Sequence, residues 1–363
     1  MQIILVGFGF YVFGDENLNG GTVMPAILKW GSLRSKENIN ITCIVRSKSS
    51  KLNAQKRFLN FKKKYIKRAN IIFQIKEYNE LDNSKKFDCA ILAIPENAHL
   101  ECLKFLVKKT TQIICVKPFT NNKNQFKEAL ELSKKSNTKI FIDFHKRFDP
   151  ANIEFIRNAS EHSHINGIFT FAYGQKTAMP FKYFKKWSNS SNPFQYLAPH
   201  YLDIIFKILR NLGVIIKDLK ISGSANYLHF KENPELISII SCNLKLYNEK
   251  YCYLINSTCN WMEPEKAPYN SRQRIEFQTS SLHLISEQDN RGQYIISDDA
   301  IKIPNPHFMT SDKSFVSSGY GVDSFYNFFE YLCKRFPQEF LVSIDEYDSI
   351  AEVIDYVNLL VKK

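Results

Sequence analysis

Residues 91–118 read ILAIPENAHLECLKFLVKKTTQIICVKP, which contains an apolar strand, a turn with a proline, an amphipathic helix and a second apolar strand. A strand–helix–strand unit of this kind is typical of a parallel α/β sheet. The second strand ends at Lys117-Pro118. Because ligands of open α/β sheets bind beyond the carboxyl ends of the strands, this stretch predicts that Lys117 lies at the ligand-binding edge.

The same alternation of strand and helix fills residues 1–148. The predicted strands are 2–7, 41–45, 71–74, 88–94, 113–116 and 139–144, with helical patterns such as 122–134 between them. The strand cores ILVG, CAILAI and IICV are continuously apolar, as expected for strands that helices cover on both faces. We therefore predict an α/β fold whose residues 1–148 form a doubly wound parallel sheet of the Rossmann type.

Residues 149–363 follow a different pattern. Long segments of alternating polarity occupy 167–175, 236–246, 251–261 and 274–286, and helical patterns occupy 200–213, 324–334 and 346–363. We predict a C-terminal α+β domain for substrate binding and oligomerisation, with a large, mostly antiparallel open sheet. Its last helix is a candidate to pack back on the first domain.

The composition excludes several classes of protein. An apolar fraction of 44% is that of a globular chain, and the eight cysteines form no CxxC pair, as expected for reduced thiols in a cytoplasmic protein without a metal site. The chain opens directly on the strand IILVGFG, and its apolar runs are shorter than the roughly 18 residues of a membrane span. The net charge is +13, but only 11 of the 49 basic residues are arginine. That bias argues against specific recognition of nucleic acid and leaves a small molecule as the expected partner.

The first strand ends in a glycine turn, GFG, at residues 7–9. Gly7 and Gly9 provide the tight turn and the bare backbone that a pyrophosphate approaches, and we assign Phe10 to the same cofactor site. The third glycine of the GxGxxG pattern is replaced by Val12. We therefore expect Gly20-Gly21-Thr22 to offer the amides of the next helix, with Pro25 tolerated in its first turn.

The end of the second strand indicates which dinucleotide binds. An acidic residue at this point would bind the ribose 2′-hydroxyl of NAD, but the strand ends in Arg46-Ser47-Lys48. These donors suit a 2′-phosphate, so the sequence predicts NADP rather than NAD. The alternative is that the three are ordinary loop residues.

The fourth strand leads into a second group of candidate cofactor contacts, Ile94, Pro95, Asn97 and His99. Asn97 is a candidate to face the nicotinamide ribose. His99 stands in the first turn of the following helix, where a neutral imidazole more often packs or caps than reacts.

At this point the chain resembles the glucose–fructose oxidoreductase / inositol dehydrogenase / MocA family, Gfo/Idh/MocA. The matching blocks are Gly7-Phe8-Gly9, Ile94-Pro95-Glu96-Asn97-Ala98-His99, Val116-Lys117-Pro118, Lys146-Arg147-Phe148 and His200-Tyr201-Leu202-Asp203. The resemblance implies hydride transfer between a nicotinamide cofactor and a sugar-like alcohol or ketone. It also implies that Lys117 and His200 lie at the reacting carbon, with Pro118 on the cofactor side and Asp203 on the substrate side.

The chemistry of the two side chains suits these roles. Removing a hydride from a secondary alcohol requires that the hydroxyl proton leave, and histidine titrates near neutral pH. We assign His200 as the acid/base and expect a helix N-terminus to favour its neutral form. Lys117 would donate a hydrogen bond to the developing alkoxide. The structural alternative for Lys117 is a surface charge at a strand end.

The sequence departs from the family pattern at three places. Val116 replaces the family's glutamate before Lys117. Asn192-Pro193 replace a glycine pair that precedes the helix of His200 and Asp203. Tyr196 replaces an acidic residue four positions before His200; we assign it to the catalytic and substrate site as a hydrogen-bond donor. These changes leave the substrate open.

Basic residues near the expected sugar site suggest a charged substrate. Lys146 and Arg147 stand at the domain junction, and a loop carries further candidates, Lys182, Lys185, Lys186 and Trp187. Such a set suits a phosphorylated or nucleotide-linked sugar, with Arg147 as a substrate contact. Solvated loop residues are the equal alternative.

Three functions remain open from the sequence. The favoured one is an NADP(H)-dependent dehydrogenase of a sugar or sugar derivative, forming a homodimer or homotetramer through the C-terminal sheet. The others are a reductase of a non-sugar C=N or C=O compound and a non-catalytic dinucleotide sensor. The missing glutamate at position 116 favours the sensor, whereas the presence of both Lys117 and His200 favours an enzyme.

Overall fold

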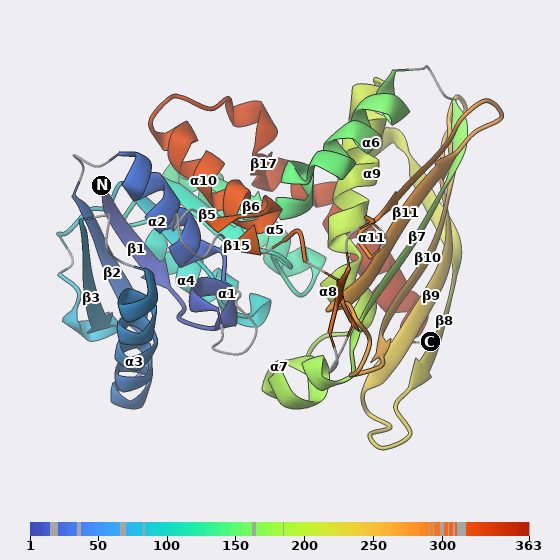
Figure 1. Cartoon of the computed structure of the whole chain (residues 1–363). Helices are drawn as coiled ribbons and strands as arrows, with labels where there is room; N and C mark the ends of the chain where they lie inside the picture. Colours follow the sequence, from blue (N-terminus) through green and yellow to red (C-terminus); the bar gives the residue numbers. More distant parts are fainter. Residues whose placement is uncertain are drawn as a thin grey trace. The chain divides into compact units, whose positions relative to one another are not determined.

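The computed structural model describes residues 1–363 except 15–20, 35–37, 66–69, 83, 162–164, 184, 290, 293, 298–300, 304, 308, 311–316 and 363. The chain divides into two compact units (Figure 1). The first unit comprises Met1–Thr120, Asn124–Phe148 and His307–Glu346. The second unit comprises Asn121–Lys123, Asp149–Pro306 and Tyr347–Lys363.

The sheet of the first unit has the strand order β17-β6-β5-β4-β1-β2-β3. The predicted parallel strands are confirmed as β1 (Gln2–Val6), β2 (Ile39–Val45), β3 (Ile71–Glu77), β4 (Cys89–Leu92), β5 (Gln112–Val116) and β6 (Lys139–Asp143). β17 (Val342–Ser343) adds an antiparallel edge beside β6. The strand order reverses between β1 and β4, which is where doubly wound sheets bind dinucleotides.

Helices cover the sheet of the first unit. They are α1 (Phe10–Phe13), α2 (Val23–Leu33), α3 (Lys48–Tyr65), α4 (His99–Leu106), α5 (Lys123–Ser136) and α10 (Tyr320–Leu332). β1, β2 and β4 are almost wholly buried, which explains their continuously apolar sequences. Each large apolar side chain buried in this way contributes about 1.5–3 kcal/mol to stability.

Residues 307–346 fall in the first unit, whereas the sequence placed them in the second domain. α10 packs by aromatic contacts, with Phe329 5.8 Å from Trp30 of α2 and Phe328 5.9 Å from Phe141 of β6 between ring centroids. The sequence predicts that this helix has a buried face, but an amphipathic pattern does not identify the surface that covers it. The last helix, α11 (Asp348–Val361), falls in the second unit.

The second unit is built on a sheet of order β12-β11-β7-β10-β9-β8. Its strands are β7 (Asn166–Lys176), β8 (Lys220–His229), β9 (Ile237–Tyr247), β10 (Cys252–Glu263), β11 (Ser271–Gln278) and β12 (His283–Glu287). β7 and β10 pair in parallel and the other pairs are antiparallel, as predicted for a mostly antiparallel sheet. Figure 1 shows the helices of this unit on one side of the sheet: α6 (Pro150–Ser160), α8 (Pro193–Leu197), α9 (Pro199–Asn211) and α11.

Shorter elements complete the chain. They are η1 (Tyr78–Glu80), η2 (Glu96–Ala98), η3 (His145–Phe148), η4 (Met179–Tyr183), α7 (Lys185–Ser188), η5 (Ile216–Asp218), β13 (Ile295–Ile296), β14 (Ile301–Lys302), β15 (Met309–Thr310), β16 (Ser317–Ser318), η6 (Gln338–Phe340) and η7 (Ile344–Tyr347). Among the described residues, no helix combines the length and the apolar character that crossing a membrane requires.

Candidate functional site

The glycine turn after β1 is shaped as a dinucleotide site requires. Gly7 has φ of +117°, and a Cβ placed on it would lie 2.1 Å from the carbonyl oxygen of Ala93. Only glycine fits there. A Cβ placed on Gly9 would meet no described atom within 4 Å, so the backbone at Gly9 is open to a ligand. α1 begins at the next residue, Phe10, and the buried Val12 lies inside that turn in place of the third glycine.

Gly21 and Thr22 have a structural use that the sequence did not predict. Gly21 has φ of +109°, and a Cβ on it would lie 2.5 Å from the amide nitrogen of Gly14. Thr22 is fully buried, and both its N–H and its Oγ1 donate to the carbonyl oxygen of Tyr11, at 2.8 and 3.0 Å. The amide assigned to a phosphate is therefore already engaged in joining α2 to α1. Gly20 lies outside the described residues.

The basic residues after β2 lie at the same edge of the sheet as the glycine turn. β2 pairs with β1 in parallel, with Ile44 opposite Val6, so both strands end there. Ser47 begins α3 by accepting a hydrogen bond from the Ser50 amide at 3.3 Å, whereas Arg46 and Lys48 are exposed. The hydroxyl of Ser47 is thus a helix cap, and the two cations face solvent.

His99 holds two strand ends together. The ring is fully buried, with Nδ1 2.8 Å from the carbonyl oxygen of Phe119 and Nε2 2.8 Å from that of Ile94. Burial lowers the pKa of His99 to about 4, against the opposing effect of the two carbonyls. Burial thus favours the neutral ring, which donates from only one of its two nitrogens, and the ring packs between the ends of β4 and β5, while Pro95 and Asn97 beside it are exposed.

Lys117 follows β5 directly and is half-buried, and its peptide bond to Pro118 is cis. The residue before it, Val116, is paired in the sheet with Asp143, the last residue of β6. The charge of Lys117 acts on Asp143 and on two histidines, His145 and His307. The carboxylate missing at position 116 thus has a counterpart on the neighbouring strand.

Asp143 belongs to a group of buried and half-buried polar side chains, which we term the Asp143 cluster. Its members are Tyr11, Asp143, His145, Lys146, His307, Tyr320 and Ser324, all in the first unit, as is Lys117 beside it. The Tyr11 hydroxyl donates to Asp143 Oδ2 and lies 2.9 Å from His145 Nδ1, and Ser324 Oγ donates to Asp143 Oδ1 at 2.5 Å.

Aromatic stacking fills the rest of the Asp143 cluster. The rings of His145 and His307 stack at 4.1 Å, and Tyr320 lies 4.9 Å from His307 and 5.4 Å from His145 between centroids. Lys146 Nζ lies 5.6 Å from the Tyr320 centroid. Burial, followed by the charge of Lys117 or Lys146, holds the pKa of His145 well below its usual range, and burial acts likewise on His307. Both rings are therefore neutral at pH 7.

Sequence reasoning missed most of this cluster. Asp143 offered one signal, a lone acid at the carboxyl end of an apolar strand, FIDF at residues 141–144. His307 and Ser324 gave no signal in the sequence, because each is more than 160 residues away from Asp143 along the chain.

Arg147, predicted as a substrate contact, is 8% exposed and forms an ion pair with Glu346 at 3.0 Å. Glu346 belongs to η7 of the first unit. The pair joins η3 to η7, so Arg147 has a structural partner that the sequence did not reveal.

The second unit positions Tyr196, His200 and Asp203 on one helical segment. Asn192 caps α8 by accepting a hydrogen bond from the Gln195 amide at 2.8 Å, and Pro193 is its first residue. This pair explains the departure from a glycine pair, because both residue types favour a helix start.

α8 continues almost directly into α9, since Ala198 between them has helical φ and ψ of −59° and −33°. His200 and Asp203 are each 1% exposed, and the ring of His200 lies 6.2 Å from that of Tyr173. The helical run thus starts at Asn192, two turns before His200. The expected effect of a free helix N-terminus on His200 is correspondingly weaker.

Trp187 and Tyr196 pack against each other, with ring centroids 4.7 Å apart, and Trp187 also contacts Trp261 at 6.3 Å. Trp187 is 7% exposed, so it supports Tyr196 rather than offering a face to a sugar. Lys182 is exposed, and the side chains of Lys185 and Lys186 lie outside the described residues.

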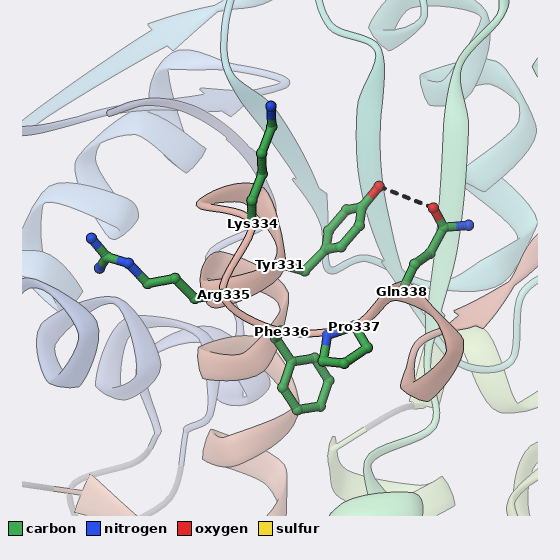
Figure 2. Close-up of a pocket in the computed structure, with 6 residues that line it drawn as sticks. All are labelled: Tyr331, Lys334, Arg335, Phe336, Pro337 and Gln338. Atoms are coloured by element: carbon green, nitrogen blue, oxygen red, sulfur yellow. Dashed lines mark hydrogen bonds between the residues drawn. The ribbon is translucent and has the colours of Figure 1, made fainter.

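A pocket of about 410 Å³ lies at the C-terminal end of α10, lined by Tyr331, Lys334, Arg335, Phe336, Pro337 and Gln338 (Figure 2). Lys139, the first residue of β6, donates to Tyr331 Oη at 3.2 Å and to Gln338 Oε1 at 2.8 Å. The pocket therefore lies beside the amino end of β6, opposite the edge where α/β sheets bind ligands.

Comparison with known proteins agrees with the predicted resemblance. Residues 3–144 match the Gfo/Idh/MocA family model, described as an oxidoreductase family with an NAD-binding Rossmann fold. An uncharacterized oxidoreductase of Schizosaccharomyces pombe is 23% identical over 124 residues, which are 33% of this chain and 32% of that protein. The aligned region thus spans about a third of that relative.

Solved structures match nearly the whole chain in fold. Scyllo-inositol dehydrogenase from Lactobacillus casei with bound NAD(H) and scyllo-inositol has a TM-score of 0.68 at 10% identity, covering 99% of this chain and 96% of that one. Myo-inositol 2-dehydrogenase from Lactobacillus plantarum has a TM-score of 0.67 at 11% identity, with 99% and 96% covered. GenD2 from gentamicin A biosynthesis, in complex with NAD, has a TM-score of 0.68 at 10% identity, with 99% and 94% covered.

Proposed function

Because residues 3–144 match the model of the Gfo/Idh/MocA family of oxidoreductases with an NAD-binding Rossmann fold, we propose that this chain is a nicotinamide-dependent dehydrogenase of sugars or cyclic polyols. The observation that carries the proposal is the position of Lys117 at the carboxyl end of β5, beside the Asp143 cluster. Solved structures of the same fold are named as inositol dehydrogenases, which makes a polyhydroxylated ring the first substrate class to test.

The residues present fit a dinucleotide. The backbone at Gly9 and Phe10 would hold the pyrophosphate, and Ile94, Pro95 and Asn97 would lie along the nicotinamide side. When bound, the nicotinamide accepts or donates the hydride. Arg46 and Lys48 support NADP as the form bound, because both are exposed directly after the end of β2, where the sequence has no acidic residue of its own.

In the proposed reaction Lys117 Nζ donates a hydrogen bond to the substrate oxygen and stabilises its negative charge as the hydride leaves. His200 accepts the hydroxyl proton on its imidazole and returns it in the reverse direction. Tyr196 donates a hydrogen bond to a neighbouring substrate hydroxyl, and Asp203 is assigned to the same side. Arg147 forms an ion pair with Glu346, and its contact with the substrate stays a prediction.

The non-catalytic alternative rested on the missing glutamate at position 116. Asp143 places a carboxylate directly beside that position, on the neighbouring strand. The observation that favoured a sensor therefore loses its weight, and we give preference to an enzyme.

A cofactor-fluorescence screen tests the proposal. Purified protein is mixed with NADP⁺ or NAD⁺ and a panel of cyclic polyols, sugars, sugar phosphates and nucleotide sugars, and reduced nicotinamide is followed by fluorescence. We expect turnover with an unphosphorylated polyol or sugar. The reverse screen uses NADPH with the matching ketones and with imines. Turnover of imines alone would replace the sugar proposal with the C=N reductase.

We also propose that the chain assembles through the sheet face of the second unit that is opposite its helices. Along β10, buried and more accessible residues alternate, and Leu254 and Met262 on the accessible face are 39% and 51% exposed. Light scattering after size exclusion tests this assembly, with Leu254→Lys expected to shift it toward the monomer. A wild-type chain that is already monomeric would refute it.

A further inference from the structure

We propose that Asp143 is the counter-charge that positions Lys117, and that Tyr11 and Ser324 hold its carboxylate in place. The inference rests on the proposed function, since it concerns the lysine assigned to the substrate oxygen. The family pattern has a carboxylate at the positions of Val116 and Tyr196, and this chain has none at either. The inference assigns that role to Asp143 of β6.

The first step is the register of the sheet. Val116 of β5 is the direct partner of Asp143 of β6 in a parallel pair. Adjacent strands lie about 4.8 Å apart. The carboxylate is therefore anchored on the strand next to Lys117, at the level of the residue that precedes it.

The second step is the fixation of the carboxylate. Tyr11 of α1 donates to Oδ2, and Ser324 of α10 donates to Oδ1 at 2.5 Å. Asp143 is only 1% exposed. The two donors come from helices far apart in the chain, so the position of the carboxylate does not depend on a flexible loop.

The third step is the charge balance. A buried carboxylate is costly unless donors and a cation accompany it. Burial raises the pKa of Asp143, whereas the hydroxyls of Ser324 and Tyr11 and the charges of His307 and Lys117 lower it. Because burial keeps His307 neutral at pH 7, Lys117 is the cation among these groups that remains charged.

The fourth step concerns the other groups that face the pair. His145 and Lys146 come from η3, the rings of His307 and Tyr320 both stack with that of His145, and Lys146 Nζ lies 5.6 Å from the Tyr320 ring centroid. Lys146 is 2% exposed, so the cluster holds a buried ammonium of its own in addition to the half-buried Lys117 beside it. Without Asp143 the two lysines would repel each other, and the half-buried Lys117 would lose its proton more readily.

Competitive acetylation tests the inference without substrate or cofactor. The full chain is labelled with limiting acetic anhydride between pH 6 and 11, and the modification of Lys117 is measured by mass spectrometry against the exposed Lys182. In Asp143→Asn we expect the midpoint of Lys117 labelling to fall by about one pH unit or more, giving about tenfold faster labelling at pH 8. Asp143→Glu, which keeps the charge, should restore most of the wild-type midpoint.

Asp149→Asn is the matched control. Asp149 is a fully buried carboxylate of the second unit that caps α6 and pairs with Arg291 at 2.6 Å. Its loss should lower the melting temperature and leave the Lys117 midpoint unchanged. An unchanged midpoint in folded Asp143→Asn, or an equal shift in Asp149→Asn, would overturn the inference.

A second measurement applies where Asp143→Asn does not fold. In Lys117→Met the buried Asp143 loses its cation, so its pKa rises further and the loss of melting temperature should be larger at pH 8 than at pH 5. An equal loss at both pH values would overturn the pairing. Absence of turnover in the sugar screen would refute the proposed function alone, because neither measurement requires a substrate.

Discussion

Lys117 and His200, the two side chains assigned to catalysis, have different surroundings. Lys117 stands beside the Asp143 cluster, whose residues come from α1, β6, η3, His307 and α10. His200 lies on the continuous helical segment that Asn192 begins, near the ring of Tyr173. Charged and hydrogen-bonding groups therefore stand near the lysine, whereas the histidine lies on a continuous helical segment near an aromatic ring.

Removing either side chain should have the largest effect. Lys117→Ala and His200→Asn should each lower kcat/KM by about 10²–10⁴-fold with the substrate that the screen identifies. NADP⁺ should still raise the melting temperature of both variants. The acidic limb of the pH–rate profile for alcohol oxidation should also disappear in His200→Asn and persist in Lys117→Ala. Wild-type rates in either variant would remove that residue from the mechanism.

The next largest effect concerns burial of a titratable group in the first unit. The pKa of His99 is lowered to about 4 from an ordinary 6.5, so the unfolded chain binds more protons between these values. Stability should therefore fall as the pH falls from 6.5 to 4, by up to about 3 kcal/mol from this residue. His99→Gln should reduce that slope in urea unfolding experiments.

His283→Gln is the matched control for this prediction, because His283 is an exposed histidine of the second unit, 3.2 Å from Glu276. It should leave most of the slope intact. Equal slopes in wild type and His99→Gln would mean that the neutral, buried state of His99 is not what stabilises the ends of β4 and β5.

A smaller effect should distinguish the two nicotinamide cofactors. Arg46→Ala should weaken the binding of NADP⁺ by about tenfold, which corresponds to the loss of one charge-assisted hydrogen bond. The binding of NAD⁺ should stay nearly unchanged. The shifts in melting temperature at equal concentrations of NADP⁺ and NAD⁺ measure the two affinities, because a ligand that binds the folded state stabilises it. Arg272→Ala, an exposed arginine on β11 of the second unit, is the control. A wild-type protein that NAD⁺ stabilises as much as NADP⁺ would contradict the prediction.

The same contrast explains what the sequence could reveal. Apolar runs and their spacing predicted the parallel sheet of the first unit and the mostly antiparallel sheet of the second, because burial on one or two faces leaves a periodic pattern. Short local motifs identified Gly7, Gly9, Lys117 and His200 as candidates. The site assignments for these residues remain predictions until the variants are measured.

Contacts between distant segments were beyond that reasoning. Asp143 became visible beside Lys117 only through the register of β5 and β6, and Ser324 only through the packing of α10. The same reason hid two further contacts. Thr22 joins α2 to α1 through its hydrogen bond to the carbonyl oxygen of Tyr11, and Arg147 pairs with Glu346. In each instance the chemistry of a residue is set by a partner that its neighbours in the sequence do not indicate.

The smallest expected effect tests the helical side of the comparison. Asn192→Ala removes the side-chain oxygen that accepts the Gln195 amide at 2.8 Å, and should cost about 1 kcal/mol of unfolding free energy in urea. Asn192→Asp keeps the acceptor for the Gln195 amide but loses the Nδ2 donor to Asn358 Oδ1 at 2.8 Å, so it should restore only part of the stability. If helix geometry alone positions His200, kcat/KM should fall only a few-fold in Asn192→Ala, while the pH midpoint of Lys117 acetylation stays at its wild-type value. A shifted Lys117 midpoint in this variant would show that the two side chains do not have independent surroundings.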